Sequence, residues 1–146
     1  MKHYQNILVA VDLTEDSADL VSRAQDIQEL SQAKLNLVHV IDYTPMVYAG
    51  GEFAVPVDPE SVDHSAKTNE AQEKLLELAE TFNIDEERCR LLCGDKEDEL
   101  VQLVEELDVD LMVVGAHDKH GFNRLLSSTA DNLLHALPCD ILMVKH

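Results

Sequence analysis

The chain has 146 residues, a length typical of one domain, and its content of 45% apolar and 27% charged residues excludes wholesale disorder. Eleven lysines and arginines against 29 aspartates and glutamates give a net charge of −18, which disfavours binding to nucleic acids and to anionic membrane surfaces. The longest apolar run is far too short to span a bilayer, and no cleavage site follows the N-terminal residues. We therefore expect residues 1–146 to form a single cytoplasmic domain without a signal peptide.

The N-terminal part of the chain carries a strand pattern followed by a helix pattern. The uninterrupted apolar run over 6–11 predicts a strand that is buried on both faces. Apolar residues at helical spacing predict a helix over 17–31, with Thr14 or Asp16 as its capping residue. The predicted buried stripe of this helix comprises Leu20, Val21, Ala24, Ile27 and Leu30.

The rest of the chain continues the alternation of strands and helices. The predicted elements are, in order, a strand over 34–41, a long proline-containing loop over 42–63, a helix ending at Phe82, a strand over 87–92, a helix over 95–107, a strand over 110–115, a helix from about 125 or 127 to 137, and a strand over 139–145. This alternation predicts an α/β fold, an open sheet of five mainly parallel strands with helices on both faces. The simplest strand order is 3-2-1-4-5.

That order places a topological switch point between the first and fourth strands, where ligands of open α/β sheets bind. It singles out residues 11–14 and the loop 115–129 before any motif is considered. The loop opens with Gly115 after a buried strand and ends with Ser128 and Thr129 near a helix N-terminus, a setting that suits a phosphate. The alternative is a surface loop that ends in an ordinary helix cap.

Five segments in the correct order resemble the universal stress protein family, and most closely its A-type branch. They are ILVAVD (7–12), LNLVHVID (35–42), DLMVVG (110–115), SSTADNLL (127–134) and CDILMVK (139–145). The resemblance covers essentially the whole chain and implies a Rossmann-like fold. One branch of that family binds ATP, and the members of this branch carry the sequence pattern G-x-x-G-x9-G-[ST] in the binding loop.

This chain matches the nucleotide-binding residues of the family's ATP-binding branch only in part. Gly115 and Thr129 match the first glycine and the final hydroxyl of the pattern, whereas Asp118 and Ser128 replace its other glycines. An acidic residue after the first strand and a valine in the second hold the adenosine in ATP-binding relatives, and Asp12 and Val40 match them. The candidate nucleotide-binding set is Asp12, Val40, Gly115, His117, Asp118, Ser128 and Thr129.

The replacement of glycine by Asp118 disfavours a triphosphate. A carboxylate about 5 Å from one phosphate charge costs roughly 3 kcal/mol at an effective dielectric constant near 20, which is about 100-fold in affinity. Lys119, His120 and Arg124 could offset part of this cost, and Gly121 could relax the loop. The A-type branch likewise lacks these glycines and is regarded as not binding ATP. We therefore expect no cofactor, with weakly bound ATP and Mg²⁺ as the alternative.

Other chemistries find less support in the sequence. His117, Asp118 and His120 could form a three-ligand metal cluster, but the geometry of a loop is loose and we expect no metal site. Cys89 and Cys93 lie in no redox motif. The Walker A, dinucleotide-fold and nucleophile-elbow patterns are all missing, so we expect no enzyme, although a slow ATPase remains an alternative.

The sequence of the last predicted strand indicates an interface between two copies of the chain. If it forms the edge of the sheet, Ile141, Leu142, Met143 and Val144 present an apolar ribbon with open backbone groups, which a second copy can pair. The resemblance implies the same antiparallel homodimer; the alternative is an edge covered by the 42–63 loop. The sequence thus predicts a non-enzymatic, homodimeric stress-response factor that acts through contacts with protein partners of unknown identity. The alternative is an ATP- or ADP-binding switch.

Overall fold

The computed structural model describes residues 3–42, 64–116 and 135–145 of the chain. The strands are β1 (Asn6–Ala10), β2 (Lys34–Asp42), β3 (Cys89–Gly94), β4 (Leu111–Ala116) and β5 (Asp140–Lys145), and the helices are α1 (Ser17–Ser31), α2 (His64–Thr81), the short 3-10 helix η1 (Glu86–Arg88) and α3 (Lys96–Glu106). The sheet has the order β3-β2-β1-β4-β5, and all four strand pairings are parallel, as predicted. The start of the last predicted helix and residues 43–63 of the predicted loop lie outside the described residues, and Asp42, the first residue of that predicted loop, is the last residue of β2.

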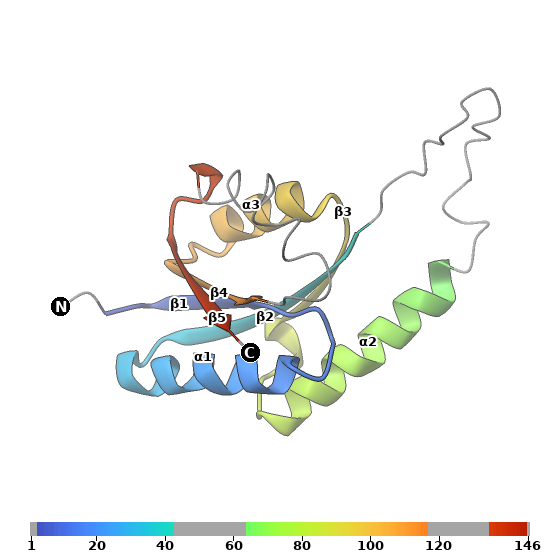
Figure 1. Ribbon diagram of the computed structural model, residues 1–146, viewed down its shortest axis with the longest axis horizontal. Coiled ribbons are helices and arrows are strands. Elements are labelled where there is room, and N and C mark those ends of the chain that lie inside the picture. Colours follow the sequence, from blue (N-terminus) through green and yellow to red (C-terminus); the bar gives the residue numbers. More distant parts are fainter. Residues whose placement is uncertain (1–2, 43–63, 117–134, 146) are drawn as a thin grey trace.

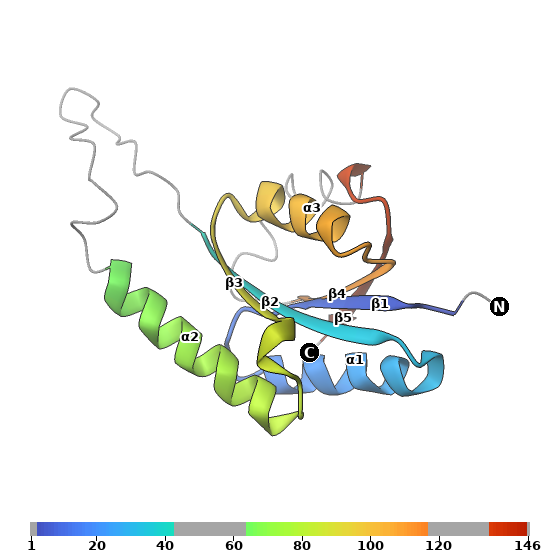
Figure 2. The same cartoon turned by 180° about the vertical axis from the view of Figure 1, so that it is seen from behind.

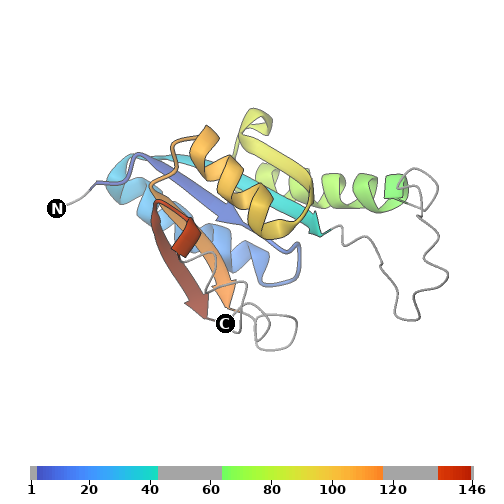
Figure 3. The same cartoon turned by 90° about the horizontal axis from the view of Figure 1, so that it is seen from above.

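Helices cover both faces of the sheet, as the alternating pattern predicts. α1 and α2 lie on one face and α3 lies on the other (Figures 1 and 2). Alternate residues of β1 supply the two cores: Ile7 and Val9 pack toward α1 and α2, whereas Leu8 packs toward α3. Figure 3 shows β5 at one edge of the sheet and β3 toward the other. Burial of Ile7, Leu8 and Val9 in these two cores explains why the middle of β1 is apolar on both faces.

One predicted core residue was wrong. Leu30 was expected on the buried stripe of α1, but 84% of it is exposed. Two successive steps of three residues, from Ala24 to Ile27 and from Ile27 to Leu30, fall about 120° short of two full helical turns. Leu30 has therefore rotated off the face that Leu20 and Ala24 bury.

Two local expectations also needed correction. Asp16 is the N-cap residue of α1, but its side chain makes no capping hydrogen bond, and the hydroxyl of Thr14 donates to Asp12. The third strand begins at Cys89 rather than at residue 87, because the acidic residues before it form η1. By contrast, α3 starts as its sequence predicts. The Asp95 carboxylate accepts a hydrogen bond from the backbone N–H of Asp98, and acidic residues fill the first turn.

Candidate functional site

β2, β1 and β4 are neighbours in the sheet, and their carboxyl ends lie side by side. Three predicted site residues, Asp12, Val40 and Gly115, lie at or just beyond these carboxyl ends. β1 pairs with β2 on one side and with β4 on the other, so the switch point lies where it was predicted. The last paired residue of β1, Ala10, lies opposite Val38 of β2 and Val114 of β4. Val40 lies two residues after Val38, and Gly115 follows Val114 directly, which places both at the end of the sheet where the chain leaves β1 toward Asp12.

Asp12 organises the connection between β1 and α1. Its Oδ1 accepts hydrogen bonds from the backbone N–H of Thr14 (3.1 Å), the hydroxyl of Thr14 (2.7 Å) and the hydroxyl of Ser17 (3.2 Å). A carboxylate that accepts several hydrogen bonds in a short turn is held in one orientation. Asp12 is therefore a positioned acceptor at the N-terminal end of α1. The sequence had marked this residue, but not its role in building the turn.

Sequence reasoning missed Leu13, which follows Asp12. Its φ is 61°, in the left-handed region that costs a residue with a side chain roughly 1–2 kcal/mol. Packing of its side chain against the core below α1 and α2 accompanies this backbone strain. Leucine has no preference for this conformation, so no local sequence signal could have revealed it. Strain of this kind concentrates in turns that position functional groups.

His39 ties β2 to the same turn. Its Nδ1 lies 2.7 Å from the carbonyl oxygen of Val11. A carbonyl oxygen only accepts hydrogen bonds, so Nδ1 carries the proton and donates it. Burial lowers the pKa of His39, although the Val11 carbonyl and the Asp12 charge act in the opposite direction. His39 is therefore a hydrogen-bonded structural residue of β2.

Val40 and Gly115 differ in what they offer a ligand. The side chain of Val40 packs in the core on the α3 side of the sheet, with only 7% of the residue exposed. Gly115 pairs with Val144 of β5 and is partly exposed. Val40 can therefore offer a ligand only an apolar surface and no polar contact from its side chain. The remaining candidates, His117, Asp118, His120, Ser128 and Thr129, lie outside the described residues.

The exposed edge of β5 is a second candidate site. The strand pairs with β4 on one side, and no other strand of the described part of the chain pairs with it. Leu142 and Met143 are each 36% exposed, Ile141 is partly buried, and Val144 is 8% exposed and belongs to the core. Only the first three of these side chains could therefore contact a partner.

Metal and redox chemistry find no support in the described ranges. Among residues 3–42, 64–116 and 135–145, no group of three or more histidine, cysteine or acidic side chains is arranged to hold a metal ion. Burial raises the pKa of the Cys89 thiol, and the charges of Glu86 and Asp85 raise it further. A thiol with a raised pKa is a poor nucleophile at neutral pH. None of the helices in the described ranges is long and apolar enough to cross a membrane.

Comparison with known proteins identifies relatives over the full length of the chain. Residues 3–145 match the model of the Universal stress protein family. Universal stress protein A homolog 1 of Coxiella burnetii is 38% identical over 142 residues, which cover 97% of this chain and 96% of that protein. The Universal stress protein A homolog of Haemophilus influenzae is 34% identical over 141 residues, covering 97% and 96% of the two chains.

A solved structure of this kind carries a ligand. The crystal structure of a universal stress protein in complex with cAMP has a TM-score of 0.58 to this chain at 25% identity, and the match covers 98% of both chains.

Proposed function

Because the chain belongs to the universal stress protein family, we propose that it is a non-enzymatic stress-response factor that acts in the cytoplasm as a homodimer and through contacts with other proteins. The observation that carries this proposal is the outer edge of β5, where Leu142 and Met143 are exposed and no further strand of the described residues pairs with the backbone. Open edges of this kind are paired or covered in stable proteins. Pairing of two β5 strands about a two-fold axis would join two sheets into one.

Replacement of exposed apolar residues by aspartate tests the dimer. We expect the double variant Leu142→Asp/Met143→Asp to be monomeric, because it places like charges opposite each other across a two-fold axis. The matched control is Leu30→Asp, which changes another exposed leucine far from the edge. Analytical ultracentrifugation measures the association state, and circular dichroism verifies that each variant is folded. A parent protein that is monomeric at every concentration, or a double variant that remains dimeric, would contradict the proposal.

A nucleotide-binding switch is the second candidate function. It is supported by the convergence of Asp12, Val40 and Gly115 at the carboxyl edge and by the cAMP complex of a structural neighbour. Against it stands Asp118, whose charge we expect to weaken triphosphate binding by about 100-fold. We therefore propose that the protein works without a cofactor.

Titration calorimetry with ATP and Mg²⁺, and separately with cAMP, distinguishes the two functions. We expect no measurable heat of ATP binding for the parent protein and a gain of binding for Asp118→Gly. Tight ATP or cAMP binding by the parent protein, lost in Thr129→Ala or Asp12→Ala, would instead establish the nucleotide switch.

A further inference from the structure

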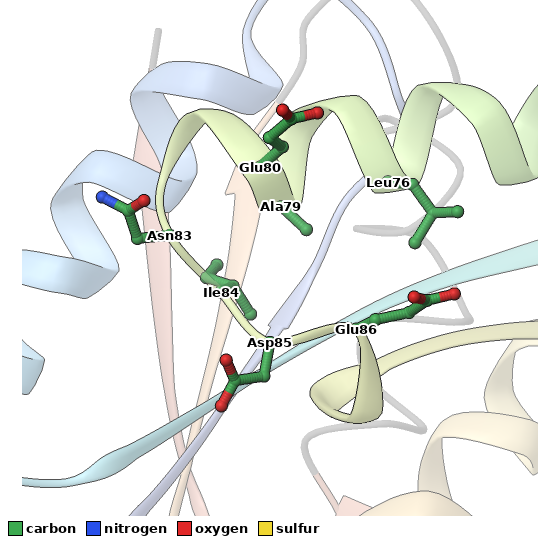
Figure 4. Close-up of a pocket in the computed structure, with 7 residues that line it drawn as sticks. All are labelled: Leu76, Ala79, Glu80, Asn83, Ile84, Asp85 and Glu86. Carbon is green, nitrogen blue, oxygen red and sulfur yellow. The ribbon is translucent and has the colours of Figure 1, made fainter.

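A groove lies between the C-terminal turns of α2 and the segment that leads into η1 (Figure 4). It has a volume of about 480 Å³ and is lined by Leu76, Ala79, Glu80, Asn83, Ile84, Asp85 and Glu86. This volume falls within the usual range for ligand sites. The groove lies at the amino end of β3, whose first residue pairs with Leu37 of β2, whereas Asp12, Val40 and Gly115 lie at or beyond the carboxyl ends of other strands. It belongs neither to those ends nor to β5.

The way α2 ends creates the groove. Asn83 has a φ of 55°, the left-handed conformation that reverses the chain after a helix. Its N–H donates to the carbonyl of Glu80 (3.2 Å), and the N–H of Ile84 donates to the carbonyl of Ala79 (2.8 Å). These two bonds form a Schellman motif, in which the residue after the left-handed one folds back against the helix. Ile84 and Ala79 consequently lie next to each other in the groove.

The groove has apolar and acidic lining residues. Leu76 and Ala79 project from α2 toward the connecting segment, with Ile84 beside them and Glu86 on the opposite side (Figure 4). Glu80, Asp85 and Glu86 add three exposed carboxylates, and the lining includes no lysine or arginine.

These carboxylates are available to a ligand. Among the described residues, no ion pair or hydrogen-bond donor engages the carboxylates of Glu80, Asp85 or Glu86. The nearby cation on α2, Lys74, pairs with Glu70 at 3.1 Å. The C-terminal end of α2 adds the negative end of a helix dipole. The electrostatic potential of the groove therefore favours a cation, and its apolar side chains favour an aliphatic group next to that cation.

We propose that this groove binds a basic, apolar segment of a protein partner, with a lysine or arginine placed next to aliphatic side chains. The inference rests on the proposed function, because it assigns a surface to the protein contacts through which the protein acts. A second copy of this chain is a poor occupant of the groove, since an acidic chain of net charge −18 does not complement three carboxylates, and the proposed dimer contact lies at β5 instead. A polyamine would satisfy the carboxylates but would leave Leu76, Ala79 and Ile84 without apolar contacts.

Binding of synthetic peptides to the full-length protein tests the assignment. The probe is a fluorescently labelled peptide of alternating leucine and arginine, and its controls replace leucine by serine or arginine by glutamate. We expect the double variant Glu80→Gln/Glu86→Gln to weaken probe binding about tenfold, in line with the loss of two surface ion pairs. The matched control Glu73→Gln/Glu77→Gln removes the same charge from exposed positions of α2 outside the groove and should change the affinity by less than about twofold.

A second variant separates the apolar contribution from charge. Leu76→Ala keeps every carboxylate, and we expect it to weaken the leucine–arginine probe but not the serine–arginine peptide. Amide chemical shifts should change mainly around residues 76–86. Equal weakening by the two glutamine pairs, equal binding of the serine–arginine peptide or of spermidine, or shift changes centred elsewhere would overturn the proposal.

These outcomes are independent of the dimer test. Failure at the groove with an intact dimer would move the partner surface elsewhere and leave the proposed function in place. Loss of the dimer with an intact groove would contradict the proposed function alone.

Discussion

At the scale of single residues, the three helices α1, α2 and α3 each end at or near a left-handed residue that is not glycine. These residues are Gln32, Asn83 and Asp108, with φ values of 62°, 55° and 51°. In each case the following N–H donates to a carbonyl of the last helical turn, as with Ala33 to Gln28. Asparagine and aspartate adopt this conformation readily, whereas glutamine adopts it at a cost. The chain has only five glycines, and of these three helix ends the one at Gln32 carries the strain.

Gln32→Gly should therefore stabilise the protein. Relief of the left-handed strain should exceed the entropy that glycine adds to the unfolded chain and raise the free energy of unfolding by about 0.5–1 kcal/mol. Asn83→Gly serves as the control and should have a smaller effect, because asparagine already tolerates this conformation. Urea denaturation measures both changes. A lower unfolding free energy for Gln32→Gly would show that the glutamine is not strained.

His39 gives the protein a stability that depends on pH. Its pKa in the folded state lies below the ordinary value of 6.5, mainly because the ring is buried. Between these two values the unfolded chain binds the proton more readily than the folded one, so the free energy of unfolding falls as the pH decreases through about 6.5. The contribution of neutral His39 is complete above that pH.

His39→Gln isolates this contribution from that of the many carboxylates. The glutamine amide can still donate to the carbonyl of Val11 but cannot titrate. We expect the parent to lose more stability than the variant between about pH 7.5 and pH 5.5, as measured by urea denaturation at each pH. Identical losses would mean that His39 titrates alike in both states.

At the scale of elements, the sequence predicts what depends on periodicity and misses what depends on individual contacts. The parallel sheet and its order follow from the alternation of strand and helix patterns. A strand buried on both faces has a continuous apolar run, whereas a helix has apolar residues only every three to four positions. Leu30 was wrongly placed on the buried stripe because its spacing from Ala24 and Ile27 rotates it off that face. The hydrogen bonds of Asp12 and the strain at Leu13 depend on the conformation of the turn between β1 and α1. The groove at Ile84 depends on the C-terminal cap of α2, a motif that tolerates several residue types.

The starts of β1 and β4 are held together by one side chain. The Asp110 carboxylate accepts hydrogen bonds from the backbone N–H groups of Gln5 (2.8 Å) and Asn6 (2.9 Å). The side-chain amide of Asn6 in turn donates to the carbonyl of Asp108 (3.1 Å). Asp110 therefore satisfies two donors at the end of the sheet where β1 begins.

Asp110→Ala leaves both of these donors without their acceptor and should lower the free energy of unfolding by about 1–3 kcal/mol. Asp110→Asn keeps one acceptor oxygen and should lose less. Asp26→Ala, an exposed aspartate on α1, controls for the change in charge. Thermal and urea denaturation provide the comparison, and an Asp110→Ala protein as stable as the Asp26→Ala control would contradict this assignment.

At the scale of the whole molecule, charge and topology divide the surface into regions with different partners. A net charge of −18 repels other anions and lowers the tendency of copies to associate without specific contacts. A dimer must therefore rely on the apolar and backbone groups of β5, and the groove beside α2 must rely on partners of opposite charge. The two proposed contacts differ in salt dependence, because screening weakens only the second.

The uniform direction of the five strands has a consequence for how the molecule could be assembled into larger complexes. Every strand points the same way, so the turn built on Asp12 follows the carboxyl end of β1, whereas the groove lies beside α2 ahead of the first residue of β3. β3, which follows the groove in the chain, and β5 form opposite edges of the sheet (Figure 3). The proposed dimer contact and the proposed peptide groove therefore belong to opposite edges of the sheet, so a second copy and a partner segment would occupy separate surfaces.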